Sequence, residues 1–216
     1  YDGFSDKYYK GRKANGVYVP RFRNIGGDSS NDDFVRGYGY QGGATRGNWK
    51  DMIAESAFGS EYKNDILKPG GWQFGISGFG EVLPYEENRM TLDYEKLDQW
   101  GLPTVTFDAE LKDNEYKMRK DMQEQAAEML EKAGLRDIET FDEPGAIGLG
   151  IHEMGTARMG SSPKNSVVNA YNQIHDCKNV YVTDGAFMTS GACVNPSLTY
   201  MAFTARAANH AVQELK

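Results

Sequence analysis

Long apolar runs are missing from this 216-residue sequence, and no stretch approaches the roughly 18 consecutive apolar residues that span a bilayer. Basic runs are missing as well, since 24 Lys and Arg face 31 Asp and Glu, for a net charge of -7. We therefore expect neither a transmembrane segment nor nucleic acid as a partner. With only two cysteines, Cys177 and Cys193, the chain also has no disulfide framework and no metal-ligand spacing, and the compartment stays open.

The sequence has only three histidines, which limits the metal sites and hydrolase sites that it could form. The segment HEMGT, which starts at His152, lacks the second histidine of the H-E-x-x-H zinc helix, so we expect no metal site. No G-x-S-x-G turn is present either. A serine hydrolase built on Ser190 and Asp184 stays open only as a minor alternative.

Glycine and aromatic residues are plentiful, with 25 Gly, 13 Tyr and 10 Phe. In the first eighty residues they occur in short apolar stretches separated by glycine, a pattern typical of short strands joined by turns. Aromatic rings can stack on a sugar ring while amides and guanidinium groups pair with its hydroxyls, although aromatic residues also favour strands for packing reasons alone. The candidate substrate-binding residues are Tyr38, Tyr40, Gln41, Arg46, Trp49, Trp72 and Gln73.

Two helices and a further strand complete the pattern. Residues 113–134 have apolar residues at three- and four-residue steps, and Gly134 is a stop signal. Residues 89–108 read as strand, broken at residues 101–103, and NVYVTD, residues 179–184, reads as another. A last helix is predicted from about Pro196 to Leu215, with Asn195 as its cap and a buried apolar stripe that includes Leu198 and Met201. The fold class is therefore α+β, a mostly antiparallel sheet with flanking helices.

His152 and Asn195 are the residues best suited to chemistry. A neutral imidazole can accept a proton at physiological pH, which suits a general base. A side-chain amide both donates and accepts, so Asn195 could orient a hydroxyl against that base. On residue types alone, His152 could equally be an ordinary loop histidine.

The strings HEMGTARMG, SVVN and NVYVTDGAFMTSGACVNPSLTYMAFTARAANHAV occur in this order near the end of the chain. Together they resemble the C-terminal region of the glucose-methanol-choline (GMC) family of flavin oxidoreductases. Upstream, GFGEVLPYEENRMTLD and the helix at 113–134 resemble the substrate-domain stretch of members that act on sugars and polyols.

The resemblance implies a set of roles. His152 would be the catalytic base, and Asn195 its partner, where other members have a second histidine. Asp184 and Gly185 would lie along the ribityl and pyrophosphate chain of FAD, and the backbone of Pro196, Ser197 and Leu198 would face the pyrimidine edge of the flavin. The implied reaction is oxidation of an alcohol, with FAD as the hydride acceptor. We expect the alcohol to be a secondary hydroxyl of a sugar or glycoside.

One departure from the family is clear. The G-x-G-x-x-G turn that holds the ADP half of FAD is absent, because GYGYQGG and GISGFG have neither its spacing nor its context. We expect residues 1–150 to form a substrate-binding lobe and residues 151–216 to supply the histidine loop and to complete an FAD lobe. The rest of that lobe would come from a missing N-terminal FAD-binding segment or subunit. The alternative is a non-catalytic carbohydrate-binding or assembly module of the same fold.

Overall fold

The computed structural model describes residues 16–46, 59–65, 71–142 and 145–215. Its strands are β1 (Gly16–Val19), β2 (Tyr38–Arg46), β3 (Trp72–Gly80), β4 (Arg89–Leu97), β5 (Pro103–Asp108), β6 (Gln173–Ile174) and β7 (Cys177–Tyr181). Its helices are α2 (Ser60–Asp65), α3 (Asp113–Lys132) and α4 (Ser197–Glu214), with single 3-10 turns η1 (Gly27–Ser29) and η3 (Gly185–Phe187). The α+β fold class is confirmed. In this part of the chain, no helix combines the length and the apolar character needed to cross a bilayer.

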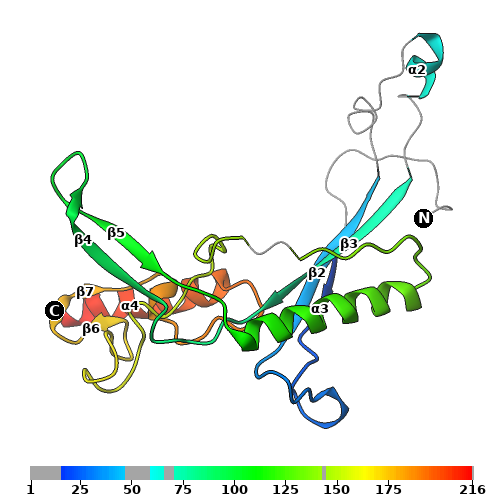
Figure 1. Cartoon of the computed structure of the whole chain (residues 1–216). Coiled ribbons are helices and arrows are strands. Elements are labelled where there is room, and N and C mark those ends of the chain that lie inside the picture. The colour runs from blue at the N-terminus through cyan, green and yellow to red at the C-terminus, as the bar shows by residue number, and fades with distance from the viewer. Residues whose placement is uncertain (1–15, 47–58, 66–70, 143–144, 216) are drawn as a thin grey trace.

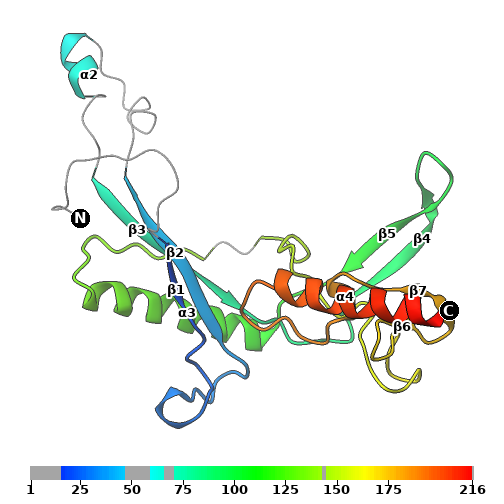
Figure 2. The same cartoon turned by 180° about the vertical axis from the view of Figure 1, so that it is seen from behind.

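The strands form three small antiparallel sheets, in the orders β1-β2-β3, β4-β5 and β6-β7. In both views, the sheet β1-β2-β3 lies with α3 in one half of an elongated molecule, and the other two sheets lie with α4 in the other half (Figures 1 and 2). The strands predicted from the first eighty residues, the interrupted strand at 89–108 and the strand before residue 184 are all present.

Helix α3 covers one face of the sheet β1-β2-β3. Because side chains alternate along a strand, Tyr38 and Tyr40 share a face of β2, and Gln41 lies on the other face. Met118 is buried against the two tyrosines, and the apolar residues packed around this cluster are Val19, Phe22, Ile76, Met122, Ala126 and Met129. The methionine stripe of α3 therefore packs in the core, and Gly134, with a φ of 85°, ends the helix as predicted.

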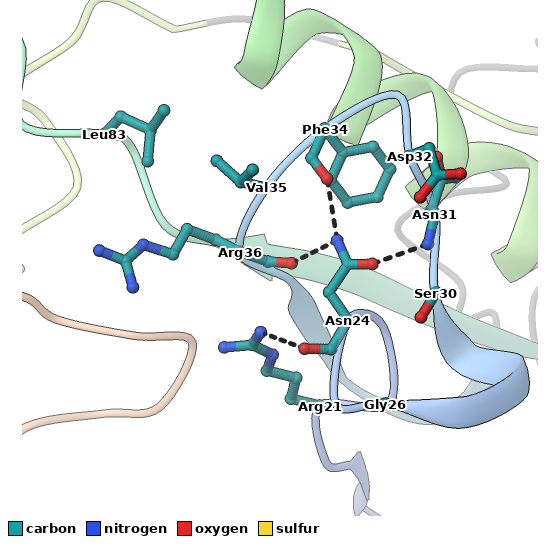
Figure 3. Close-up of a pocket in the computed structure, with 10 residues that line it drawn as sticks. All are labelled: Arg21, Asn24, Gly26, Ser30, Asn31, Asp32, Phe34, Val35, Arg36 and Leu83. Atoms are coloured by element: carbon teal, nitrogen blue, oxygen red, sulfur yellow. Dashed lines mark hydrogen bonds between the residues drawn. The ribbon is translucent and has the colours of Figure 1, made fainter.

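A loop between β1 and β2 is held by one asparagine. The amide nitrogen of Asn24 donates to the carbonyl oxygens of Phe34 (3.0 Å) and Arg36 (2.8 Å), and its Oδ1 accepts from the Asn31 backbone N–H (2.7 Å; Figure 3). Arg21 also donates to the Asn24 carbonyl at 3.0 Å. The loop thereby forms a wall of a pocket of about 570 Å³.

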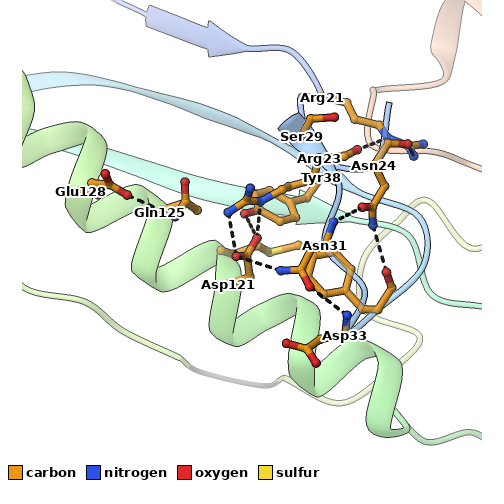
Figure 4. Close-up of polar contacts among 12 residues, drawn as sticks. Arg21, Arg23, Asn24, Ser29, Asn31, Asp33, Tyr38, Asp121, Gln125 and Glu128 are labelled. Atoms are coloured by element: carbon orange, nitrogen blue, oxygen red, sulfur yellow. Dashed lines mark hydrogen bonds and ion pairs between the residues drawn. The ribbon is translucent and has the colours of Figure 1, made fainter. Parts of the chain in front are cut away.

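The same loop is tied to α3 through a partly buried ion pair. Arg23 contacts both carboxylate oxygens of Asp121, at 2.8 and 2.9 Å, and the hydroxyl of Tyr38 donates to the same carboxylate (Figure 4). Burial is the main reason that the pKa of Tyr38 lies above its usual range, so the phenol stays protonated as a donor. This contact fixes the β1–β2 loop and the sheet against one side of the helix.

Candidate functional site

The loop that carries His152 has an unusual backbone. Ile151 has a φ of 57°, which is rare for a β-branched residue, and Gly148 and Gly155 have φ values of 92° and 90°. The Glu153 carboxylate accepts from the Gly150 N–H at 2.7 Å and closes a small turn around His152, which is half-buried. The positive φ of Ile151 is strained backbone of the kind that tends to occur at functional sites.

This loop lies against the segment that follows β7. The Ala157 N–H donates to the Ala186 carbonyl at 2.9 Å, and the Met159 N–H donates to the Phe187 carbonyl at 2.8 Å. A Cβ atom at position 185 would lie 2.9 Å from the carbonyl oxygen of Glu153, so this contact requires Gly185. The structure therefore brings the His152 loop next to Asp184 and Gly185.

The predicted flavin-binding residues differ in exposure. Asp184 is exposed and uses Oδ1 to accept from the Ala186 N–H at 2.9 Å, which caps η3, whereas Gly185 is buried. Pro196 is buried at the N-cap of α4, and Ser197 and Leu198 are exposed in its first turn. The first N–H groups of a helix have no acceptor within the helix, so this turn offers donors to a bound group.

Asn195 does not cap α4, which corrects the sequence-based expectation. The N-cap is Pro196, which has helical dihedral angles, and no side chain caps the helix. The amide nitrogen of Asn195 instead donates to Oε1 of Gln41 on β2, at 3.4 Å. In the described part of the chain, no hydrogen bond joins Asn195 to His152, and their pairing stays a prediction.

Strand alternation divides the predicted substrate residues between the two faces of the sheet. Gln41 and Gln73 share the face opposite α3, and Gln73 is exposed there. Trp72 lies on the α3 side and is half-buried. Arg46 is the last residue of β2, and Trp49 lies outside the described residues.

Tyr38 and Tyr40 do not fit the predicted contact with substrate. Their exposed fractions are 0% and 1%, and their hydroxyls are used inside the core, by Asp121 and by the Met122 carbonyl (2.7 Å). Burial also raises the pKa of Tyr40 to about 12. Both tyrosines are packing residues, and we leave them out of the substrate site.

A second contact between the sheet and the C-terminal segment was not anticipated from the sequence. The hydroxyl of Ser190 donates to Glu81, which directly follows β3, and Arg36 lies 3.8 Å from the same carboxylate. Nearby, burial raises the pKa of the Cys193 thiol above its ordinary value, so the thiol stays protonated at neutral pH. No signal in the sequence could link Ser190 to Glu81, because 109 residues separate them.

Two pockets border this region. The pocket of about 570 Å³ in Figure 3 is lined by the β1–β2 loop and Leu83, and none of the predicted site residues lines it. A smaller pocket of about 280 Å³ lies between residues 187–190 and the first turns of α4, where Thr199 and Phe203 line it. The smaller pocket is thus adjacent to the predicted flavin-binding residues. Among the described residues, no group of three or more His, Cys, Asp or Glu side chains could hold a metal ion.

Comparison with known proteins gives one family and several relatives. The sequence model of the family described as GMC oxidoreductase matches residues 84–204. The chain is 30% identical to 2-methyl-1,2-propanediol dehydrogenase of Mycolicibacterium austroafricanum over 94% of this chain and 37% of that protein. It is 33% identical to paromamine 6'-oxidase of Streptomyces fradiae, over 61% of this chain and 24% of that protein. It is 30% identical to the fructose dehydrogenase large subunit of Gluconobacter japonicus, over 63% of this chain and 24% of that protein. The chain thus spans 37% of the length of the first of these relatives and 24% of the length of the other two.

Proposed function

Because the chain belongs to the GMC oxidoreductase family, we propose that it works as part of a larger FAD-dependent enzyme that oxidises an alcohol. The observation that carries this proposal is the contact between the His152 loop and the segment around Gly185. This contact supports the proposal because it brings the loop of the predicted base next to Asp184 and Gly185, two of the predicted flavin-binding residues. The division into a substrate lobe, residues 1–150, and a segment that completes the FAD lobe is part of the same proposal.

In this proposal, the residues after β7 hold FAD. The exposed carboxylate of Asp184 would pair with the hydroxyl-bearing chain of the cofactor, and the free N–H groups of Ser197 and Leu198 would face its ring. That first turn of α4 is exposed and its backbone donors have no acceptor within the helix, which fits an electron-rich ring edge. Bound FAD would supply the acceptor for the hydride of the alcohol carbon.

The remaining chemistry belongs to this chain. A ring nitrogen of His152 would take the proton of the substrate hydroxyl, and Asn195 would hold the hydroxyl oxygen. Loss of this proton from the hydroxyl and of the hydride from the alcohol carbon leaves a carbonyl product. The hydride carries away the two electrons of the oxidation. His152 has no hydrogen-bond partner among the described residues, which leaves its imidazole available for a substrate.

We further propose that the substrate is a sugar or glycoside oxidised at a secondary hydroxyl. Gln73, exposed on the face opposite α3, would supply a polar contact for a ring with several hydroxyls. Arg46, Trp49 and Trp72 stay candidates from the sequence alone, since Trp72 lies on the other face of the sheet. The similarity to a fructose dehydrogenase subunit supports a sugar, whereas the match to a propanediol dehydrogenase over 94% of this chain favours a small diol as the second candidate.

Two measurements on the complete FAD-loaded protein test the reaction and the substrate class, each with glycosides, small diols, simple primary alcohols and a sterol. Anaerobic mixing follows the reduction of FAD, and steady-state rates with an added electron acceptor give kcat/KM. We expect FAD reduction by an alcohol, with the highest kcat/KM for a glycoside, because each polar group that an apolar substrate leaves unpaired costs about 1–3 kcal/mol.

In the same experiment, His152→Ala should keep bound FAD and slow its reduction by about 10² to 10⁴-fold, the usual effect of losing a positioned base. A protein that binds glycosides but oxidises nothing would be the non-catalytic module instead. A higher kcat/KM for the diol or the sterol would overturn the sugar assignment alone, and an unchanged rate in His152→Ala would remove the histidine from the mechanism.

A further inference from the structure

Gln41 lies in the middle strand of the sheet β1-β2-β3, between Tyr18 on β1 and Ser77 on β3. Its side chain projects from the face opposite α3, and its Oε1 accepts from the Asn195 amide nitrogen at 3.4 Å. The donor and the acceptor are 154 residues apart in the chain, so this contact joins the sheet directly to the loop before α4.

The rest of the Gln41 amide is poorly satisfied. Its Nε2 is buried without a hydrogen-bond partner among the described residues. A buried donor without a partner destabilises the folded state, a penalty that an apolar side chain of the same shape would avoid. Among the described residues, the amide of Gln41 makes its hydrogen bond through Oε1 alone.

The contact with Oε1 of Gln41 bears on the orientation of the Asn195 side-chain amide. An asparagine amide can rotate by half a turn and exchange its oxygen with its nitrogen. In the structure Oε1 of Gln41 faces this amide, and with the two amides arranged in this way Nδ2 of Asn195 is directed at β2. The Oδ1 atom and one N–H of Nδ2 then remain for another partner.

The position of the loop does not depend on Gln41 alone. Ser190 and Glu81 form a separate contact between the same loop and the sheet, five residues before Asn195. Loss of the Gln41 acceptor should therefore release the amide of Asn195 and leave the loop in place.

We propose that Gln41 is a positioning residue that fixes the orientation of the Asn195 side-chain amide toward the substrate hydroxyl. The inference rests on the proposed function, because Asn195 has a substrate to hold only if the enzyme oxidises an alcohol. It also changes the role predicted for Gln41, from a contact with substrate to a contact with a catalytic residue.

The test uses the complete FAD-loaded protein and Gln41→Met, which keeps the length of the side chain and removes the amide. We expect FAD reduction by the best alcohol of the panel to slow about 10-fold, the equivalent of one hydrogen bond of about 1.4 kcal/mol, while KM changes less than about 3-fold. The urea midpoint should be equal to or higher than that of the wild type, because an unpaired buried donor has been removed. A residue with a purely structural role would lower both the rate and the midpoint.

A double-mutant cycle with Asn195→Ala separates a direct from an indirect role. If Gln41 acts through Asn195, Gln41→Met should slow the Asn195→Ala enzyme by less than about 2-fold, so the two effects should not add. Gln125→Met is the matched control, since it makes the same change on α3, where the only described side-chain hydrogen bond of Gln125 goes to Glu128 at 3.2 Å. The rate of this variant should equal that of the wild type.

Additive effects of the two substitutions, or a full rate in Gln41→Met while the wild type oxidises alcohol, would overturn this inference and leave the proposed function standing. A wild-type enzyme that oxidises no alcohol in the panel would overturn both.

Discussion

Glu115, at the start of α3, is a carboxylate with an exposed fraction of only 3%. It accepts hydrogen bonds from the backbone N–H groups of Leu83 (3.1 Å) and Lys112 (3.0 Å) and from the hydroxyl of Tyr85 (3.0 Å). One side chain thereby caps the helix and holds the irregular segment between β3 and β4. The sequence contains the acid at the right position for a capping box, but the contacts with residues 83 and 85 come from tertiary structure.

The pH dependence of stability follows from these contacts. Burial acts to raise the pKa of Glu115, but the hydrogen bonds from Leu83, Lys112 and Tyr85 outweigh it, and the pKa lies below its ordinary value. A carboxyl group whose pKa is lower in the folded state stabilises the protein above its unfolded pKa, about 4.3. This contribution is lost as the pH falls from there through the folded pKa.

We therefore expect Glu115→Gln to lower the free energy of unfolding by about 1–3 kcal/mol at pH 7, since the amide keeps only one acceptor oxygen. The difference from the wild type should shrink as the pH falls below the unfolded pKa of about 4.3 and through the lower pKa of the folded carboxyl group. Urea unfolding of the complete protein at pH 7, 5 and 3 measures this. Glu131→Gln, on the exposed side of the same helix, is the control, and a difference that stayed constant with pH would contradict the prediction.

At the scale of the element, the β2–β3 pair depends on two glycines in different ways. A Cβ atom at Gly42 would lie 2.8 Å from the Cα atom of Ile76 and would also contact the Gly75 carbonyl, so backbone would have to move. At Gly75, a Cβ atom would meet nothing within 4 Å. The two positions are adjacent in the ladder, which makes them a matched pair.

Gly42→Ala should destabilise the pair by about 1–3 kcal/mol, the usual cost of forcing extra volume into a packed site. Gly75→Ala should change stability by less than about 0.5 kcal/mol, because no neighbour is displaced. Amide hydrogen exchange in β2 and β3 of the complete protein reports this locally. Equal exchange rates in the two variants would show that the strands separate more easily than the close approach at Gly42 implies.

The positions of the strands and helices were easier to predict from this sequence than the face on which each side chain lies. The strands, α3 with its stop at Gly134, and α4 follow from periodicity and local signals. Tyr38, Tyr40 and Gln41 were grouped by residue type, although the two-residue period of a strand puts Gln41 on the opposite face from the tyrosines. Asn195 was expected to cap α4 because local signals favour it, but its partner is Gln41, which no local pattern could reveal.

At the scale of the whole molecule, α4 presents an apolar face that the described residues of this chain do not cover. The stripe predicted to be buried is exposed, with fractions of 79% for Leu198, 69% for Met201 and 88% for Leu215. The prediction of burial is therefore wrong for the described part of the chain, in which nothing else packs over these residues. Apolar surface of this extent is characteristic of an interaction site.

We expect the isolated chain to bind a hydrophobic dye and to purify without stoichiometric flavin. The reason is that it offers a helix terminus and one carboxylate to FAD, without the glycine-rich turn that binds a pyrophosphate. The complete protein should be yellow and should bind far less dye. Absorbance and dye fluorescence of both preparations are the measurements, and a yellow isolated chain would show that these residues hold FAD unaided.

The two contacts between the sheet and the C-terminal segment, Asn195 with Gln41 and Ser190 with Glu81, bear on how such enzymes can be recombined. A chimera that takes its sheet from another family member inherits whatever stands at positions 41 and 81. If those residues cannot accept a hydrogen bond, the amide of Asn195 and the hydroxyl of Ser190 lose their acceptors. A chimera should therefore take the sheet and the loop that it holds from the same family member, although the two are far apart in the sequence.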